Sequence, residues 1–280
     1  MRERGLYRVG IDVGGTFTDL VAFDEETGEL LNIKIPSVPR NPEEGVISAL
    51  RQLLESRDSD SIRLIGHATT IATNALFGQI DLRLPKTAMI TTKGFRDVVE
   101  IGRQRRAEVY NLFFKRPPVL VDRRHRYEVE ERTGSDGTII TPLNKVDVEK
   151  ALDDIEREGV ESLAIGFINS HVNRSNEEEA LNIARERLHH VQLSASSRVS
   201  GGYREYERFS TVVVNAVLTP IINRYLSKLE VDLKAIGINK PLYVMQSNGG
   251  MATAEVVEQR PVTVVESGPA SGVIAAAWLG

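Results

Sequence analysis

Residues 10–19 read Gly-Ile-Asp-Val-Gly-Gly-Thr-Phe-Thr-Asp, and an apolar run to Phe23 follows them. This pattern predicts a strand, a tight turn built on two glycines, and a second strand. Glycine has no Cβ, so backbone N–H groups of such a turn can approach a phosphate closely, and nearby hydroxyl groups add donors. We therefore expect the turn to bind phosphate through four residues, Gly14, Gly15, Thr16 and Thr18.

Acidic residues lie on both sides of this turn. Asp12 is near the end of the first strand and Asp19 lies in the second. Because hard cations prefer oxygen ligands, Asp12 can hold Mg²⁺ directly or through water. The stretch is neither a dinucleotide-binding Gly-x-Gly-x-x-Gly loop nor a P-loop, since no Gly-Lys-Ser/Thr sequence follows it. An ordinary β-hairpin is the alternative, and it explains the glycines but not the acidic and hydroxyl residues around them.

The composition is that of an ordinary globular protein. A chain of 280 residues with 41% hydrophobic residues can form one large domain or two modest ones. The net charge of −4 gives no reason to expect nucleic-acid binding, and the absence of cysteine excludes disulfides and thiolate catalysis. The longest apolar stretch, residues 212–222, is too short to span a bilayer, so we expect a cytoplasmic protein that binds no membrane.

Strand and helix signals alternate after an initial meander of three strands over residues 7–37. Further strands are expected at residues 62–65, 87–91, 162–168, 191–194, 242–246 and 262–265, and a long helix from Tyr206 contains Pro220, which would kink or break it. A basic segment between Gly102 and Arg126 is expected to be a long loop, either a solvated surface or a face for an anionic ligand. The alternation predicts a ribonuclease-H-like α/β layer with a mixed sheet.

Six motifs together resemble those of a known family. They are the turn of residues 10–19, His-Ala-Thr-Thr-Ile-Ala-Thr-Asn-Ala-Leu at 67–76, Thr-Thr-Lys-Gly-Phe-Arg-Asp-Val-Val-Glu-Ile-Gly-Arg at 91–103, Glu-Tyr-Glu-Arg-Phe-Ser-Thr at 205–211, Met-Gln-Ser-Asn-Gly-Gly at 245–250 and Ser-Gly-Pro-Ala-Ser-Gly at 267–272. In this order they resemble the hydantoinase A / 5-oxoprolinase family, which includes N-methylhydantoinase-type subunits and subunits of acetone and acetophenone carboxylases. Residue 68 is Ala where the family more often has Gly, and its methyl group would narrow the pocket.

The resemblance implies a fold of the actin, Hsp70 and sugar-kinase type, in which two ribonuclease-H-like domains hold Mg-ATP between them. It implies that residues 12–16 form the first phosphate loop, that Asp12 belongs to the Mg²⁺ water shell, and that Asp19 joins this shell or orients an attacking water. Residues 1–198 would be the family's N-terminal region and residues 199–280 the start of its catalytic region. Because family members continue into a second phosphate loop, we expect the chain to be truncated before that second phosphate-binding domain.

The resemblance also implies a reaction. Amide rings resist attack by water, and transfer of the γ-phosphoryl group of ATP to the ring carbonyl oxygen makes the carbonyl carbon electrophilic. We expect ATP- and Mg²⁺-dependent ring opening of hydantoin, N-methylhydantoin or 5-oxoproline, by an A-type subunit or a fragment of one, within a homo-oligomer or a complex with a B-type subunit. The alternatives are an ATP-dependent acetone or acetophenone carboxylase subunit, or a non-catalytic nucleotide-binding module that needs a partner chain.

Two further polar segments follow predicted strands, at positions where α/β proteins bind ligands. The substrate-side candidates are His67, which is also a candidate catalytic residue, with Thr69, Thr70 and Asn74 in the first segment and Ser247 and Asn248 in the second. Each has a plainer interpretation: His67 as a core residue, the threonines as helix caps, and the second segment as a turn. Residues 267–272 can likewise form an anion site at a helix N-terminus or a packing turn.

Overall fold

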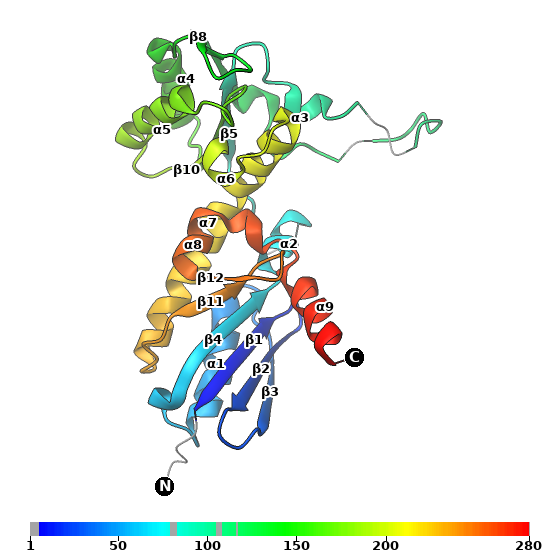
Figure 1. Ribbon diagram of the computed structural model, residues 1–280, viewed down its shortest axis with the longest axis vertical. Helices are drawn as coiled ribbons and strands as arrows, with labels where there is room; N and C mark the ends of the chain where they lie inside the picture. The colour runs from blue at the N-terminus through cyan, green and yellow to red at the C-terminus, as the bar shows by residue number, and fades with distance from the viewer. Residues whose placement is uncertain (1–5, 79–82, 105–107, 116, 280) are drawn as a thin grey trace. The chain divides into compact units, whose positions relative to one another are not determined.

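The computed structural model describes residues 6–78, 83–104, 108–115 and 117–279 (Figure 1). The chain divides into two compact units. Unit 1 comprises residues 1–84 and 221–280, and unit 2 comprises residues 85–220. Unit 1 is therefore assembled from both ends of the chain, and this division differs from the two sequence regions expected above.

Unit 1 contains a six-stranded mixed sheet in the order β12-β11-β4-β1-β2-β3. Its strands are β1 (Tyr7–Val13), β2 (Phe17–Asp24), β3 (Leu30–Pro36), β4 (Ile62–Thr69), β11 (Leu242–Met245) and β12 (Met251–Thr253). The first three form the predicted antiparallel meander, while β4 runs parallel to β1 and β11 runs parallel to β4. The mixed sheet of the predicted α/β layer is thus confirmed.

Helices accompany this sheet. They are α1 (Pro42–Leu54), η1 (Ser59–Ser61), α2 (Ile71–Leu76), α8 (Ala254–Gln259), η3 (Pro261–Val264), α9 (Ser267–Leu279) and the second half of α7 (Glu205–Ala235). Alternate residues of β1 and β2, such as Val9, Ile11 and Leu20, are buried. α1 packs against β1, β2 and β3. The side chains on the other face of these strands, including Asp12, are more exposed.

One predicted strand of unit 1 is wrong. Residues 262–265 are rich in β-branched residues, yet most of this run lies in the 3₁₀ helix η3. Pro261 at the start of the turn has no N–H to give to a strand partner, and the Thr263 hydroxyl donates to the Arg260 carbonyl at 2.8 Å. The local hydrogen bonds of this turn therefore replace those of a sheet.

Unit 2 contains a four-stranded, all-parallel sheet in the order β10-β9-β5-β6. These strands are β5 (Thr87–Thr92), β6 (Arg126–Val129), β9 (Ser162–Gly166) and β10 (Gln192–Ala195). The remaining elements are α3 (Val98–Ile101), η2 (Arg123–His125), the hairpin of β7 (Arg132–Thr133) and β8 (Ile139–Thr141), α4 (Lys145–Arg157), α5 (Ser175–Arg187), α6 (Ser196–Val199) and the first half of α7. Residues of β5, β9, α4 and α5 together form an apolar core.

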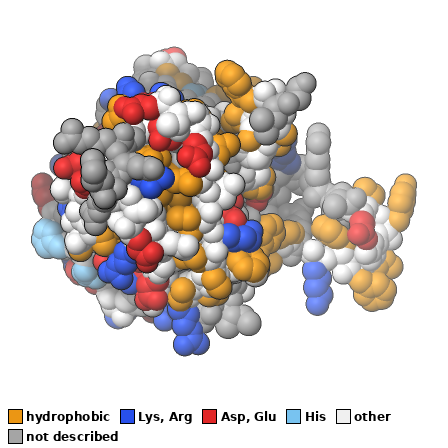
Figure 2. Space-filling view, turned by 90° about the horizontal axis from the view of Figure 1, so that it is seen from below, with side chains coloured by type: hydrophobic (Ala, Val, Ile, Leu, Met, Phe, Trp, Pro, Cys, Tyr) orange, Lys and Arg blue, Asp and Glu red, His pale blue; other side chains and the backbone are white. Residues whose placement is uncertain are grey.

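The described residues of the basic segment 102–126 form a long loop that leads into η2 and the first residue of β6, and ion pairs neutralise two arginines at its end. Arg123 Nε and Nη2 donate to the two carboxylate oxygens of Asp97, each at 2.9 Å. Arg126 is buried and Nη1 donates to Glu100 Oε2 at 2.8 Å. Arg123 and Arg126 thus serve the fold rather than an anionic ligand. On the face of the molecule drawn in Figure 2, acidic, basic and hydrophobic side chains are intermingled.

The long helix α7 continues through Pro220 without ending. Proline has no N–H, so the carbonyl of Ala216, four residues earlier, lacks its normal helical partner. The Ser162 hydroxyl donates to that carbonyl at 2.5 Å from the buried start of β9. A side chain of the sheet therefore supplies the hydrogen bond that the proline cannot make. Among the described residues, none of the helices combines the length and apolar character that a membrane crossing requires.

We expect Ser162→Ala to destabilise unit 2 by about 1–3 kcal/mol, because it leaves the buried Ala216 carbonyl unsatisfied. In a Pro220→Ala background the same substitution should cost clearly less, since the helix regains its own N–H donor. Urea denaturation of the two single variants and the double variant measures this coupling, with the exposed Ser48→Ala in α1 as control. Equal costs in the two backgrounds would contradict the assignment.

Candidate functional site

Three charged side chains lie in one row across unit 1. In the paired strands, Asp12 of β1 is opposite Asp19 of β2, and Asp19 is opposite Lys34 of β3. Lys34 Nζ donates to Asp19 Oδ1 at 2.8 Å. The lysine therefore offsets one of the two neighbouring negative charges, and Asp12 keeps no such partner within the row.

The environment of Asp12 disfavours its ionised form. Desolvation by the surrounding protein, and secondly the charge of Asp19, raise the pKa of Asp12 above its usual range. Part of the side chain is nevertheless exposed. A carboxylate that is crowded but open on one side gains stability when a cation binds beside it. Asp12 is therefore well suited to contact a metal ion.

Two paired carboxylates, Asp12 and Asp19, are the donor set for Mg²⁺ beside the turn. Within the described residues, no three His, Asp or Glu side chains gather into a group that could hold a metal ion. Mg²⁺ is commonly bound by one or two carboxylates together with substrate phosphates and water. Asp12 and Asp19 supply that number, so these residues fit a Mg²⁺ shared with a phosphate ligand.

Some backbone groups of the glycine turn form hydrogen bonds within the protein, and others are exposed. The Gly14 N–H donates to the Phe17 carbonyl at 3.0 Å, and the Ser37 hydroxyl donates to the Gly14 carbonyl at 2.8 Å. Gly15 and Thr16 are exposed. In the described part of the chain, their N–H groups donate to no backbone carbonyl outside the regular strand pairs. Gly14 thus shapes the turn, whereas Gly15 and Thr16 can donate to a ligand.

Thr18 does not lie on the ligand side of the turn. Its side chain is fully buried, and its hydroxyl lies 3.0 Å from the Ser37 hydroxyl. α1 approaches so closely that a Cβ on Gly45 would be 2.6 Å from Thr18 Oγ1. We therefore correct its assignment: Thr18 supports the turn from the core and is removed from the phosphate-binding set.

The segment after β4 borders the turn. Thr70 Oγ1 donates to the Val13 carbonyl at 3.3 Å and accepts from Asn74 Nδ2 at 3.1 Å. A Cβ on Gly15 would lie 3.9 Å from Asn74 Nδ2, and a cavity of about 20 Å³ between these groups is large enough for one water. Thr69 is buried and its hydroxyl accepts from the Ile71 N–H at 3.2 Å, one residue before Thr70, which occupies the N-cap position of α2. Thr70 and Asn74 therefore border the glycine turn, whereas Thr69 is buried beside it.

His67 is a packing residue in this structure. The ring is 1% exposed, Nδ1 lies 3.3 Å from the Ile11 carbonyl, and Nε2 lies 2.7 Å from the Tyr225 hydroxyl. Because the carbonyl can only accept, we assign the proton to Nδ1, and Nε2 then accepts from Tyr225. Burial lowers the pKa of His67 from 6.5 to about 4. Both nitrogens are engaged and water is excluded, so we do not retain His67 as a catalytic base.

Ser247 and Asn248 are engaged in a turn between β11 and β12. The Ser247 hydroxyl donates to the Thr263 carbonyl at 2.9 Å, and Asn248 Oδ1 accepts from the Gly250 N–H at 2.8 Å. Gly249 has φ +85°, and a Cβ there would lie 2.4 Å from Ile274 Cδ1 of α9. These contacts favour the plain-turn interpretation over a role toward substrate.

The N-terminus of α9 adjoins the charged row. A Cβ on Gly268 would lie 3.9 Å from Asp12 Oδ1, and the Ser267 hydroxyl donates to the Thr69 carbonyl at 3.1 Å. The helix dipole therefore adds a partial positive charge beside Asp12. Further along α9, Val273 and Trp278 are 70% and 87% exposed.

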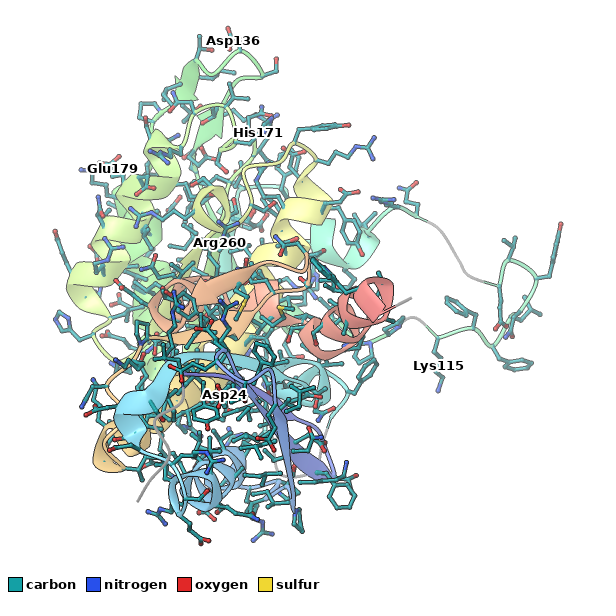
Figure 3. All side chains as sticks on the ribbon, turned by 60° about the horizontal axis from the view of Figure 1, so that its bottom comes forward. Asp24, Lys115, Asp136, His171, Glu179 and Arg260 are labelled. Atoms are coloured by element: carbon teal, nitrogen blue, oxygen red, sulfur yellow. The ribbon has the colours of Figure 1, made fainter. Side chains whose placement is uncertain are left out.

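Sequence reasoning missed Lys34 and Ser37. The signal for Lys34 was available in the hairpin turn after β2, which follows Asp24 (labelled in Figure 3). Asp24 Oδ1 accepts from the Glu26 N–H of this turn at 2.8 Å. Counting outward from this turn pairs Phe23 with Leu30 and hence Asp19 with Lys34. Ser37 follows β3, and no local pattern connects it with the glycine turn.

Comparisons with known proteins give a consistent result. A family model described as the hydantoinase/oxoprolinase N-terminal region matches residues 8–188, and one described as hydantoinase/oxoprolinase matches residues 208–280. An uncharacterised protein of Methanocaldococcus jannaschii is 46% identical over 97% of this chain and 40% of its own length. Caprolactamase subunit alpha of Pseudomonas jessenii is 33% identical over 95% of this chain and 39% of its own length.

A solved structure is similar over the same extent. The crystal structure of the ATP-dependent caprolactamase from Pseudomonas jessenii matches with a TM-score of 0.87 and 32% identity, over 98% of this chain and 41% of that chain. The chain therefore spans about 40% of the length of the curated relatives described here.

The lowered pKa of His67 predicts a pH-dependent stability. Between pH 6.5 and about 4 the unfolded state binds the proton that the folded state excludes, so stability rises with pH across this window. The wild type should therefore lose up to about 3 kcal/mol more than His67→Gln when the pH falls from 6.5 to 4. Urea denaturation of both proteins across this range measures the difference, and parallel pH profiles would contradict a neutral buried His67.

Proposed function

Because the chain belongs to the hydantoinase/oxoprolinase family, we propose that it is the nucleotide-binding part of an ATP-dependent enzyme that opens cyclic amides. The observation that carries this proposal is the arrangement around Asp12. A partly exposed carboxylate of raised pKa lies beside Asp19 and beside the N-terminus of α9. This combination suits a ligand that brings both a divalent cation and an anion, which is the chemistry of Mg-ATP.

Each group then has a defined role. The N–H groups of Gly15 and Thr16, with the Thr16 hydroxyl, would donate to phosphate oxygens. Asp12 and Asp19 would hold Mg²⁺, which when bound supplies the positive charge that neutralises the phosphates. Lys34 would hold the Asp19 side chain in place through their hydrogen bond. Thr70 and Asn74 would border the same ligand.

The proposed reaction begins with transfer of the γ-phosphoryl group to the carbonyl oxygen of a ring amide. ADP is the leaving group of this transfer. Water then adds to the activated carbon, the ring C–N bond breaks and the amine takes up a proton, which leaves an acyl phosphate. A second water cleaves the acyl phosphate to the carboxylate and phosphate. Such a transfer depends mainly on positioning and charge neutralisation. The solved relative is described as an ATP-dependent caprolactamase, which favours a lactam among the cyclic amides as substrate.

The complete activity is proposed for an assembly rather than for these residues alone. The chain spans about 40% of the length of its curated relatives, and one relative is described as a subunit alpha. We propose that ring opening requires the remaining part of the enzyme, supplied within the same assembly by a second type of subunit or by further chain.

Replacing Asp12 by Asn should abolish Mg-dependent ATP binding and lower the ATP-coupled ring opening of the whole assembly by roughly 10²-fold or more, because the carboxylate that faces the cation is lost. Calorimetric titration of Mg-ATP and product analysis with hydantoin, 5-oxoproline and ε-caprolactam measure the two effects. Asp60→Asn is a matched control, since it removes the same charge from an exposed position of unit 1.

Other outcomes would identify the alternatives. ATP turnover that requires bicarbonate and a ketone such as acetone would place the protein with the carboxylases. ATP binding without turnover in any assembly would indicate a non-catalytic nucleotide-binding module. Equal binding by wild type and Asp12→Asn would overturn the assignment of the site.

A further inference from the structure

We propose that unit 2 contains a separate site, which binds an uncharged cyclic amide through a mostly apolar cavity between α3, Phe114, residues 117–120 and the first half of α7. The choice of a cyclic amide as ligand rests on the proposed function, whereas the preference for an uncharged ligand rests on the cavity itself.

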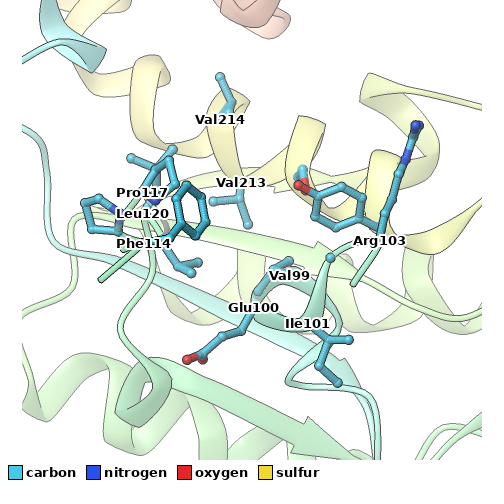
Figure 4. Close-up of a pocket in the computed structure, with 14 residues that line it drawn as sticks. Val99, Glu100, Ile101, Arg103, Phe114, Pro117, Leu120, Val213 and Val214 are labelled. Carbon is cyan, nitrogen blue, oxygen red and sulfur yellow. The ribbon is translucent and has the colours of Figure 1, made fainter. Parts of the chain in front are cut away.

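The cavity has the size and the walls of a small-molecule site. Its volume is about 820 Å³, within the roughly 300–1,000 Å³ typical of ligand pockets. Figure 4 shows Phe114, Pro117 and Leu120 on one side and Arg103 on the other, with Val213 between them. The lining is apolar except for four side chains, Glu100, Arg103, Tyr206 and Ser210. A ligand with an apolar body and few polar atoms fits this surface.

Two sequence motifs that the Asp12 site does not use meet at this cavity. The run 91–103 contributes its last five residues, and the run 205–211 contributes Tyr206 and Ser210. Tyr206, Ser210, Val213 and Val214 follow one another at helical spacing, so they form one stripe of α7 directed at the cavity. Both motifs thus acquire a common location in the fold.

The two charged residues of the lining are already paired. Glu100 Oε2 accepts from Arg126 Nη1 at 2.8 Å, and Arg103 Nε donates to Glu207 Oε1 at 2.7 Å. A charged ligand would have to compete with these pairs or lose its hydration without a counter-charge, and burial of an unpaired charge is costly. The cavity therefore favours a neutral ligand over an anionic one.

Two hydroxyl groups can recognise an amide. Tyr206 and Ser210 each carry a group that both donates and accepts, which matches the one N–H and one carbonyl of a lactam. The Tyr206 ring is held close to Gly102, which has φ +59°, and a Cβ on this residue would lie 3.5 Å from the ring. Glycine at this position allows both the backbone turn and the approach of the tyrosine.

The test compares two ligands that share one ring. The compound 2-pyrrolidone is a five-membered lactam, and 5-oxoproline is the same ring bearing a carboxylate. Titration of the methyl-labelled chain by NMR, without nucleotide, should show saturable shifts of the valine methyl groups with 2-pyrrolidone and ε-caprolactam, with a Kd on the order of 1 mM for ligands this small. 5-Oxoproline should bind at least about tenfold more weakly, since its charge has no free partner.

Variants separate this site from its surroundings. Tyr206→Phe should weaken lactam binding about three- to tenfold by removing one hydrogen bond, and Val214→Phe should weaken it by occupying space one helical turn from Ser210. Tyr203→Phe, at an exposed tyrosine nearby in sequence, should have no effect. Glu207→Gln frees the Arg103 charge and should raise the affinity for 5-oxoproline relative to 2-pyrrolidone.

The outcome is independent of nucleotide binding. The titration contains no nucleotide, so failure of the Mg-ATP experiment would not decide this one. The inference is overturned if the folded chain shows no saturable shifts with either lactam, if 5-oxoproline binds as tightly as 2-pyrrolidone, or if Tyr206→Phe and Val214→Phe bind like the wild type.

Discussion

The register of the first three strands is the constraint on which the candidate site depends. Side chains of a strand alternate between two faces, so a slip of one residue would move every side chain to the opposite face. In unit 1 the register pairs Asp12 with Asp19 and Asp19 with Lys34. The glycine turn fixes one end of this arrangement through the Gly14 N–H, and the Asp24 side chain fixes the next turn. With this register the Thr18 side chain lies in the core, and the Asp12 side chain lies on the more exposed face of the sheet.

This constraint explains which parts of the site were predictable. The strand and turn that contain Asp12, Gly15 and Thr16 form where the sequence predicts them, because their geometry is local, while the ligand roles of these residues stay predictions. The assignment of Thr18 to the phosphate-binding residues was wrong because it relied only on the hydrogen-bonding capacity of the hydroxyl. Side chains alternate between the two faces of a strand, so Thr18 and Asp19 point to different faces of β2. His67 could not be judged from sequence, since its burial depends on Tyr225, which lies 158 residues further along the chain.

In the fold, too, the elements that depend on neighbouring residues were predictable, and those that depend on distant residues were not. The meander and the long helix follow from hydrophobic spacing and turn residues, and both are confirmed. Residues 262–265 were wrong because proline and a threonine side chain created a local turn that outweighed their strand propensity. The continuity of α7 through Pro220 was also beyond local reasoning, because the compensating donor, Ser162, comes from a different element. Unit 1 combines two segments that are far apart in the chain, and no local sequence pattern indicates that these segments fold together.

Charge compensation separates the two candidate sites chemically. In the row of unit 1, two carboxylates meet one lysine, so a negative charge remains and attracts a cation, while the adjoining α9 N-terminus favours an anion. At the cavity of unit 2, Glu100 and Arg103 each have a partner of opposite charge within the unit. The first site therefore suits a highly charged ligand that brings its own cation, and the second suits a neutral one.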